Sequence, residues 1–168
     1  SGLSQKRELR KIEKLVLESF FEEANDALEN SKSLILSSDD KYKAQYYFYD
    51  AKINNELNEF ENAISSLQNL LNLSKSVYNT KIEQEYENLG LTIANSIVNS
   101  AVQDNKDGNF NDAASKLIMA YEMDKDEYID YLYFAAGSAV NAKDYEKSLD
   151  YYLILSLIHI SEPTRPSS

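Results

Sequence analysis

The chain has 168 residues, with 28 acidic and 17 basic side chains, one histidine, and no cysteine or tryptophan. A net charge of −11 argues against a nucleic-acid surface, which needs clustered Lys and Arg, and against binding to an anionic membrane. The lack of cysteine excludes thiol catalysis, thiolate zinc sites and a disulfide framework. Four glycines and two prolines are too few for the frequent turns of an all-β domain.

Two origins can account for the sequence of residues 1–4. Gly2 and Ser4 occupy the −3 and −1 positions of a small-residue cleavage site before Gln5, as at the end of a secretory signal peptide. Ser-Gly is also a common cloning scar. We favour the signal-peptide remnant, which implies an exported, periplasmic protein of a bacterium rather than a cytoplasmic one.

Residues 155–165 resemble the translation of a sequencing adapter read in frame. We therefore expect residues 155–168 to be a non-native tail and the natural reading frame to be interrupted near Ile154. This tail contains His159, the only histidine, and both prolines. A catalytic or metal-binding role for His159 is therefore not expected.

Between the two ends, apolar residues recur every three or four positions, which is the period of an amphipathic helix. In chain order these apolar stripes cover residues 9–16, 21–35, 42–57, 60–71, 80–106, 110–121, 128–140 and 145–154. Polar or Gly-containing breaks separate most of them, and no window alternates at period two. We predict an all-α fold. The first two stripes lack a Gly or Pro between them, so they could also form one continuous helix.

A short motif occurs four times, consisting of an aromatic residue, two mostly polar residues and a small residue. Its copies are Phe21–Ala24, Phe60–Ala63, Phe110–Ala113 and Tyr145–Ser148. About twelve positions before each small residue lies another small or apolar residue: Ile12, Ala51, Ala101 and Ala136. Small residues on two neighbouring helices allow the helices to approach closely, so the motif predicts helix pairs.

This pattern resembles the tetratricopeptide repeat over residues 5–154. The resemblance implies a right-handed α-α superhelix of about four helix-turn-helix units, covering about residues 5–36, 40–74, 80–123 and 126–154. The small residues of the motif are 39, 50 and 35 positions apart, against about 34 in the family. The extra residues predict an overlong first helix in the third unit. The alternative is an unrelated α-bundle.

No catalytic or metal site is expected from the sequence. The paired carboxylates lie beside helix ends and on exposed stripes, whereas acid–base catalysis needs two carboxyls in a shielded cleft. Residues 104–112 alternate oxygen-bearing side chains with a glycine, but they fail the register of a calcium-binding loop. We expect no cofactor and no enzymatic activity.

The resemblance implies a concave groove that is lined by the first helix of each unit and holds a protein or peptide partner. The groove positions are Gln45, Phe48, Tyr49 and Lys52 in the second unit, Asn95, Val98, Asn99 and Val102 in the third, and Asp130, Tyr133 and Phe134 in the fourth. We expect Tyr47 and Tyr145 to fill the core between units, and Gly137 to mark close helix packing.

Two functions remain open from the sequence. The first is a non-catalytic scaffold that binds a protein or peptide partner. The second is the sensory or ligand-binding arm of a larger bacterial receptor or regulator. For an interruption near Ile154, we also expect Tyr151 and Leu153 to be exposed and to promote self-association.

Overall fold

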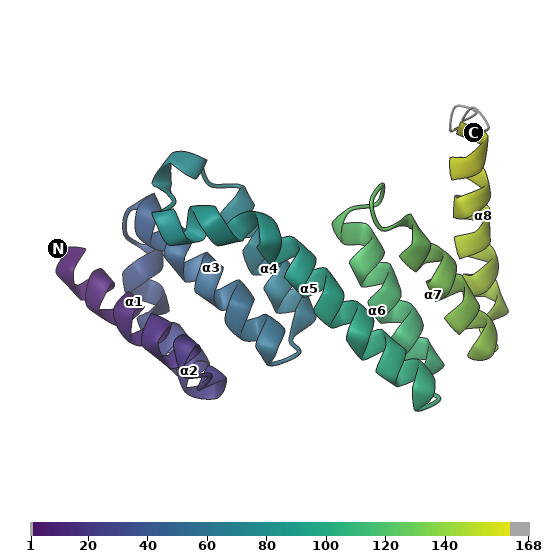
Figure 1. The fold of residues 1–168 in the computed structure, drawn as a ribbon, viewed down its shortest axis with the longest axis horizontal. Helices are drawn as coiled ribbons and strands as arrows, with labels where there is room; N and C mark the ends of the chain where they lie inside the picture. The colour runs from purple at the N-terminus through teal and green to yellow at the C-terminus, as the bar shows by residue number, and fades with distance from the viewer. Residues whose placement is uncertain (1, 162–168) are drawn as a thin grey trace. The chain divides into compact units, whose positions relative to one another are not determined.

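The computed structural model describes residues 2–161, with side chains for residues 2–158. This part of the chain is all-helical and contains no strand, which confirms the predicted fold class. The elements are α1 (Gly2–Leu17), α2 (Phe21–Leu36), α3 (Asp40–Glu56), α4 (Phe60–Leu71), the 3₁₀ helix η1 (Lys75–Val77), α5 (Thr80–Lys106), α6 (Phe110–Met123), α7 (Ile129–Asn141) and α8 (Tyr145–Ser161) (Figure 1). The overlong helix expected in the third pair is α5, which has 27 residues.

The chain divides into two compact units, and the boundary falls within α5. Unit 1 comprises residues 1–96, and unit 2 comprises residues 97–168. In unit 1, α3 packs against α1, α2 and α4. In unit 2, α7 packs against both α6 and α8.

Four turns of the same geometry join the helices into pairs: α1 with α2, α3 with α4, α5 with α6, and α7 with α8. Each turn contains one residue with a positive φ, and these residues are Ser19 (62°), Asn58 (59°), Gly108 (80°) and Lys143 (61°). Each lies five residues before the small residue of the motif. The possibility that α1 and α2 form one continuous helix is therefore wrong, because the left-handed Ser19 ends α1.

The hydrogen bonds of these turns also repeat. In each turn, the residue after the left-handed one donates its N–H to a carbonyl five positions earlier, as in the Schellman motif. The four N···O distances are 2.9 Å for Phe20 to Leu15, 2.8 Å for Glu59 to Asn54, 2.7 Å for Asn109 to Asp104 and 2.9 Å for Asp144 to Ala139. The structure therefore repeats the turn as well as the helices.

The small residues of the motif are buried, as the sequence predicts. Ala24, Ala63 and Ala113 are fully buried, as are their partners Ile12, Ala51, Ala101 and Ala136, and Ser148 is 4% exposed. In unit 2, two of these alanines, Ala101 and Ala113, belong to one cluster together with Leu117 and Ala135. An alanine on each of two crossing helices lets their backbones approach closely.

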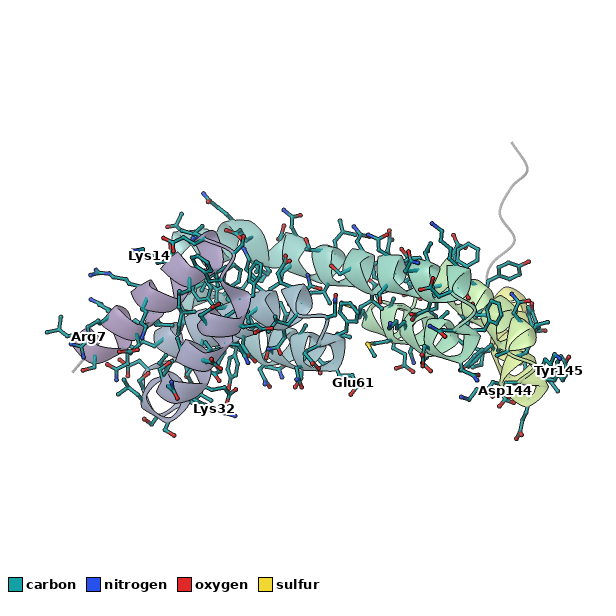
Figure 2. The ribbon with its side chains drawn as sticks, turned by 90° about the horizontal axis from the view of Figure 1, so that it is seen from below. Arg7, Lys14, Lys32, Glu61, Asp144 and Tyr145 are labelled. Carbon is teal, nitrogen blue, oxygen red and sulfur yellow. The ribbon has the colours of Figure 1, made fainter. Side chains whose placement is uncertain are left out.

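The aromatic residue of the motif differs in burial among the four copies. Phe60 is buried, and Phe21 and Phe110 are half-buried. Tyr145 is 65% exposed, so the expectation that it fills the core is wrong. It begins α8 beside Asp144 (Figure 2), and within the described residues α8 packs mainly on α7, which leaves the ring uncovered. Tyr47 is half-buried.

Ion pairs connect the helices within each unit. In unit 1, Lys81 of α5 donates to Glu13 of α1 at 2.8 Å, and the Tyr78 hydroxyl donates to the Leu70 carbonyl at 2.6 Å. In unit 2, Lys116 of α6 pairs with Asp104 of α5 at 2.7 Å. These contacts tie α5 to α1 in unit 1 and α6 to α5 in unit 2.

Candidate functional site

An apolar groove of about 460 Å³ lies in unit 2. Its lining, the unit 2 groove, consists of Val98, Val102, Asn105, Leu117, Tyr131, Tyr133, Phe134, Gly137, Ser138, Asn141 and Tyr152. Helices α5 and α7 supply most of it at three- and four-residue spacing, so one face of each helix points into the groove. The volume falls in the range of about 300–1,000 Å³ that is typical of ligand pockets.

Exposed aromatic rings form one wall of this groove. Tyr133 is 57% exposed and Phe134 is 52% exposed, and their ring centroids are 5.9 Å apart. The Tyr133 ring also meets Tyr152 of α8 at 6.3 Å in an edge-to-face arrangement. Large exposed rings in one place mark a surface that another molecule could cover.

A glycine keeps the floor of the groove open. A Cβ atom built on Gly137 meets no atom within 4 Å, so the expectation that Gly137 marks close helix packing is wrong. The adjacent Ser138 is buried and donates to the Asn105 side chain at 3.0 Å, which ties α7 to α5. Gly137 therefore leaves space in the groove rather than room for a neighbouring helix.

The groove positions predicted from the sequence fall into two classes. The structure brings Val98, Val102, Tyr133 and Phe134 together in the unit 2 groove. Asn99 and Asp130 of unit 2 are exposed but do not line it, and Asn95 of unit 1 is also exposed. Their role in binding a partner stays a prediction.

The predicted positions on α3 are largely unavailable to a partner. Phe48 is fully buried and Tyr49 is 3% exposed, so their placement on an open groove is wrong. The reason is that α3 packs against three helices of unit 1, which leaves little of its surface free. Gln45 is half-buried and donates to the Lys41 carbonyl of its own helix at 3.4 Å.

Lys52 lies beside a smaller cavity of unit 1. Its ammonium group pairs with Glu85 of α5 at 2.9 Å and lies 5.2 Å from the centre of the Phe48 ring. The cavity between these helices measures about 130 Å³, and the buried Asn55 lines it. Because Lys52 already has a carboxylate partner, it is not a free cation for a partner's acidic group.

Unit 1 also contains a polar cavity of about 400 Å³ that the sequence analysis missed. Its lining, the unit 1 cavity, consists of Asn25, Glu29, Lys32 and Leu36 on α2, Tyr46, Tyr47, Asp50 and Asn54 on α3, and Asn62, Ser65, Ser66 and Asn69 on α4. Each set has helical spacing, so three polar stripes converge. The helical spacing of the asparagines was the sequence signal for this cavity. A polar stripe on one helix is usually a solvated face, so the signal did not point to a cavity.

Asp50 is the central charged group of this cavity. Its carboxylate accepts a hydrogen bond from the Asn54 side chain at 2.9 Å and another from the Ser66 hydroxyl. Asn54 and Ser66 are themselves more than nine-tenths buried. Burial raises the pKa of the Asp50 carboxyl above its ordinary value, and the neighbouring Glu29 raises it further.

The face of α8 that lies away from its neighbours is apolar. Leu149, Leu153 and Leu157 are 59%, 53% and 66% exposed. The expected exposure of Leu153 is confirmed, whereas Tyr151 is half-buried against the core of unit 2. Helix α8 continues into the segment expected to be a non-native tail, but the side chain of His159 lies outside the described residues.

Two searches of the described residues were negative. No helix among residues 2–161 is long and apolar enough to cross a membrane. In the same part of the chain, no group of three or more His, Cys, Asp or Glu side chains is arranged to hold a metal ion.

Comparisons with protein-family models, with curated proteins and with solved structures found no match to this chain.

Proposed function

We propose that this chain is a non-catalytic interaction module that holds a protein or peptide partner in the unit 2 groove. The observation that carries the proposal is the exposed pair Tyr133 and Phe134 beside an open space of about 460 Å³. Tyrosine and phenylalanine supply large contact areas, and residues of this kind are enriched in protein interfaces.

The chemistry of the groove favours a partner segment with an apolar anchor and basic flanks. An aliphatic or aromatic side chain fits the space above Gly137, between the rings of α7 and the valines of α5. The exposed Asp130 lies one turn before Phe134 on the same helix, where it can meet a basic residue that follows the anchor. The net charge of −11 favours the same partner.

We also propose that the helix pairs form a right-handed, tetratricopeptide-like solenoid of four units. Support comes from the four left-handed turns at one register and from the buried small or apolar residues at matching positions on both helices of every pair. A solenoid repeats one supersecondary unit, and a unit of this type buries its apolar face against its neighbours. A crystal structure of the chain would test the handedness directly.

Peptide display tests the binding proposal. We expect peptides selected on the full chain to share one apolar residue beside Lys or Arg. Binding of the best peptide should fall at least tenfold in Phe134→Ala, which removes a wall of the groove, and in Gly137→Leu, which fills its floor. Leu149→Ala and Ser115→Leu are matched controls at exposed sites outside the groove, and they should bind normally.

Two results would contradict the proposal. One is a set of selected peptides with no apolar position in common. The other is a peptide whose affinity is the same in Phe134→Ala and in Leu149→Ala, because the binding surface would then lie elsewhere.

A second candidate function is the ligand-binding arm of a larger receptor or regulator. The unit 1 cavity favours it, because this cavity has a ligand-sized volume and a polar lining that suits a small molecule better than a protein segment. Binding of a small molecule there, with no peptide selected by unit 2, would support this function over the scaffold.

A further inference from the structure

The unit 1 cavity is built around a carboxylate that has no cation. Among the described residues, no Lys or Arg nitrogen lies within the 4.0 Å ion-pair distance of Asp50. Its two hydrogen-bond donors, Asn54 and Ser66, are both neutral. A buried carboxylate is costly unless a counter-charge or hydrogen bonds compensate it, so this site has room for a positive partner.

The charged side chains of the lining are two carboxylates, Asp50 and Glu29, and one ammonium group, Lys32, so their net charge is negative. On α2, Glu29 and Lys32 both line the cavity, and the effect of Glu29 on Asp50 is the larger of the two. On α3, the pKa of the Tyr46 hydroxyl lies above its ordinary value because of burial and because of Asp50 and Glu29. Helix α4 contributes only neutral amides and hydroxyls. A cation is therefore attracted into the cavity, and an anion is repelled.

The remaining lining suits a small organic cation. Tyr46 and Tyr47 lie with their ring centroids 5.7 Å apart, and they offer aromatic surface to the carbon atoms beside a charged nitrogen. Asn25, Asn62 and Asn69 place amide groups around the cavity, and these can bind further polar groups of a ligand. The volume of about 400 Å³ is ample for a molecule of metabolite size.

We propose that the unit 1 cavity binds a small polar molecule that carries an ammonium group, with Asp50 as the counter-ion. Asn54 and Ser66 orient the carboxylate through their hydrogen bonds, and the ligand's ammonium hydrogens meet the lone pairs that remain free. The proposal rests on the second candidate function, the binding of a small molecule in the unit 1 cavity, and names the chemical class of that molecule. The site lies entirely within unit 1, so the proposal is independent of the unit 2 groove.

Thermal unfolding and calorimetry of the full chain test the proposal. The probes are putrescine, tyramine and glucosamine, each compared with a neutral counterpart: 1,4-butanediol, 4-(2-hydroxyethyl)phenol and glucose. We expect at least one amine to raise the unfolding temperature in about 150 mM salt, which screens non-specific attraction to an acidic protein. The corresponding neutral compound should have no effect.

Variants then locate the site. Asp50→Asn keeps the size of the side chain and one of its two acceptor oxygens but removes the charge of Asp50, and it should weaken amine binding at least tenfold. Glu61→Gln makes the same change of charge at an exposed position of α4 outside the cavity (Figure 2), and it should bind as the unaltered chain does. Asn69→Lys adds a positive charge at an exposed part of the lining and should weaken binding without disturbing the fold.

Three results would overturn the proposal. They are equal binding of an amine and its neutral counterpart, equal loss of binding in Asp50→Asn and Glu61→Gln, and no effect of any of the three amines. None of these results bears on the peptide experiment with unit 2, so the two proposals fail separately.

Discussion

Opposing effects act on the charged form of the Asp50 carboxyl on α3. Its hydrogen bonds to Asn54 and Ser66 stabilise the charged form, whereas burial and the nearby Glu29 destabilise it. Burial is the largest of these effects, so the pKa of the carboxyl is higher in the folded chain than in the unfolded chain, where it is about 3.9. Folding therefore makes protonation of Asp50 more favourable than it is in the unfolded chain.

This preference predicts a pH dependence of stability. A carboxyl whose pKa is raised by folding contributes stability that is present below its unfolded pKa and lost as pH rises through its folded pKa. Asp50→Asn should therefore be more stable than the unaltered chain at pH 7.

Urea unfolding at pH 7 and at pH 4.5 measures this difference. The advantage of Asp50→Asn should shrink at the lower pH, because a larger fraction of Asp50 is protonated there in the unaltered chain. Glu61→Gln is exposed and should show no such change. A destabilised Asp50→Asn at pH 7 would mean that the hydrogen bonds to the carboxylate outweigh its burial.

At the scale of the element, the four turns between paired helices use four different residues for one backbone conformation. Glycine adopts a positive φ without a steric penalty, and asparagine adopts it more readily than most residues. Ser19 and Lys143 have no such preference, yet they have the same φ as Asn58. Packing of the helix pair must therefore impose the conformation, and the cost is stored in the turn.

The turns can be tested by exchanging residues. Lys143→Gly removes the steric cost and should raise stability, while Gly108→Ala introduces it and should lower stability by about 1 kcal/mol. No atom lies within 4 Å of a Cβ at Gly108, so a clash would not confuse the result. Chemical denaturation of both variants measures whether the free energy of unfolding rises or falls in each. A loss of stability in Lys143→Gly would show that the lysine side chain makes a contribution beyond its backbone.

Some features of the helices and turns could be predicted from the sequence, and others could not. The helices and the buried alanines were predictable, because an apolar stripe or a small residue at a fixed spacing has few other uses in a soluble chain. The end of α1 was not predictable, because Ser19 carries no signal for a left-handed turn. Its conformation depends on how α1 and α2 pack, and a local stretch of sequence does not contain that information.

Two pairs of adjacent aromatic residues show why the candidate site could be predicted from the sequence only in part. Phe48 with Tyr49 and Tyr133 with Phe134 look alike in sequence, and both pairs were expected on a groove. The first pair is buried because α3 is surrounded by three helices, whereas the second pair is exposed on α7. The unit 1 cavity was missed for a related reason, since its polar stripes lie on three helices and only folding brings them together.

At the scale of the whole molecule, the apolar face of α8 bears on the state of the chain in solution. Leu149, Leu153 and Leu157 are more than half exposed and lie at four-residue spacing on one side of the helix. An apolar stripe of this kind is stable in water when another surface covers it. Two copies of the chain could cover each other's stripes.

We therefore predict concentration-dependent self-association through α8. Analytical ultracentrifugation should detect it in the unaltered chain, and Leu153→Lys together with Leu157→Lys should shift the equilibrium to the monomer. Leu71→Lys changes an exposed leucine of α4 and serves as the control. A monomer at all concentrations, or equal dissociation by the control, would contradict the prediction. Removal of residues 151–168 should have the same effect as the double substitution.

The shared register of the left-handed turns has an evolutionary consequence. A gene segment that runs from one turn to the next encodes the second helix of one pair, the connection, and the first helix of the following pair. If such a segment were duplicated in tandem, as from Asn58 to Asp107, its one new junction would join Asp107 to Asn58. The left-handed residue and the carbonyl that accepts the next N–H would keep the register of the other turns there. The chain could therefore gain a repeat by a single recombination event, without needing a glycine at the new junction.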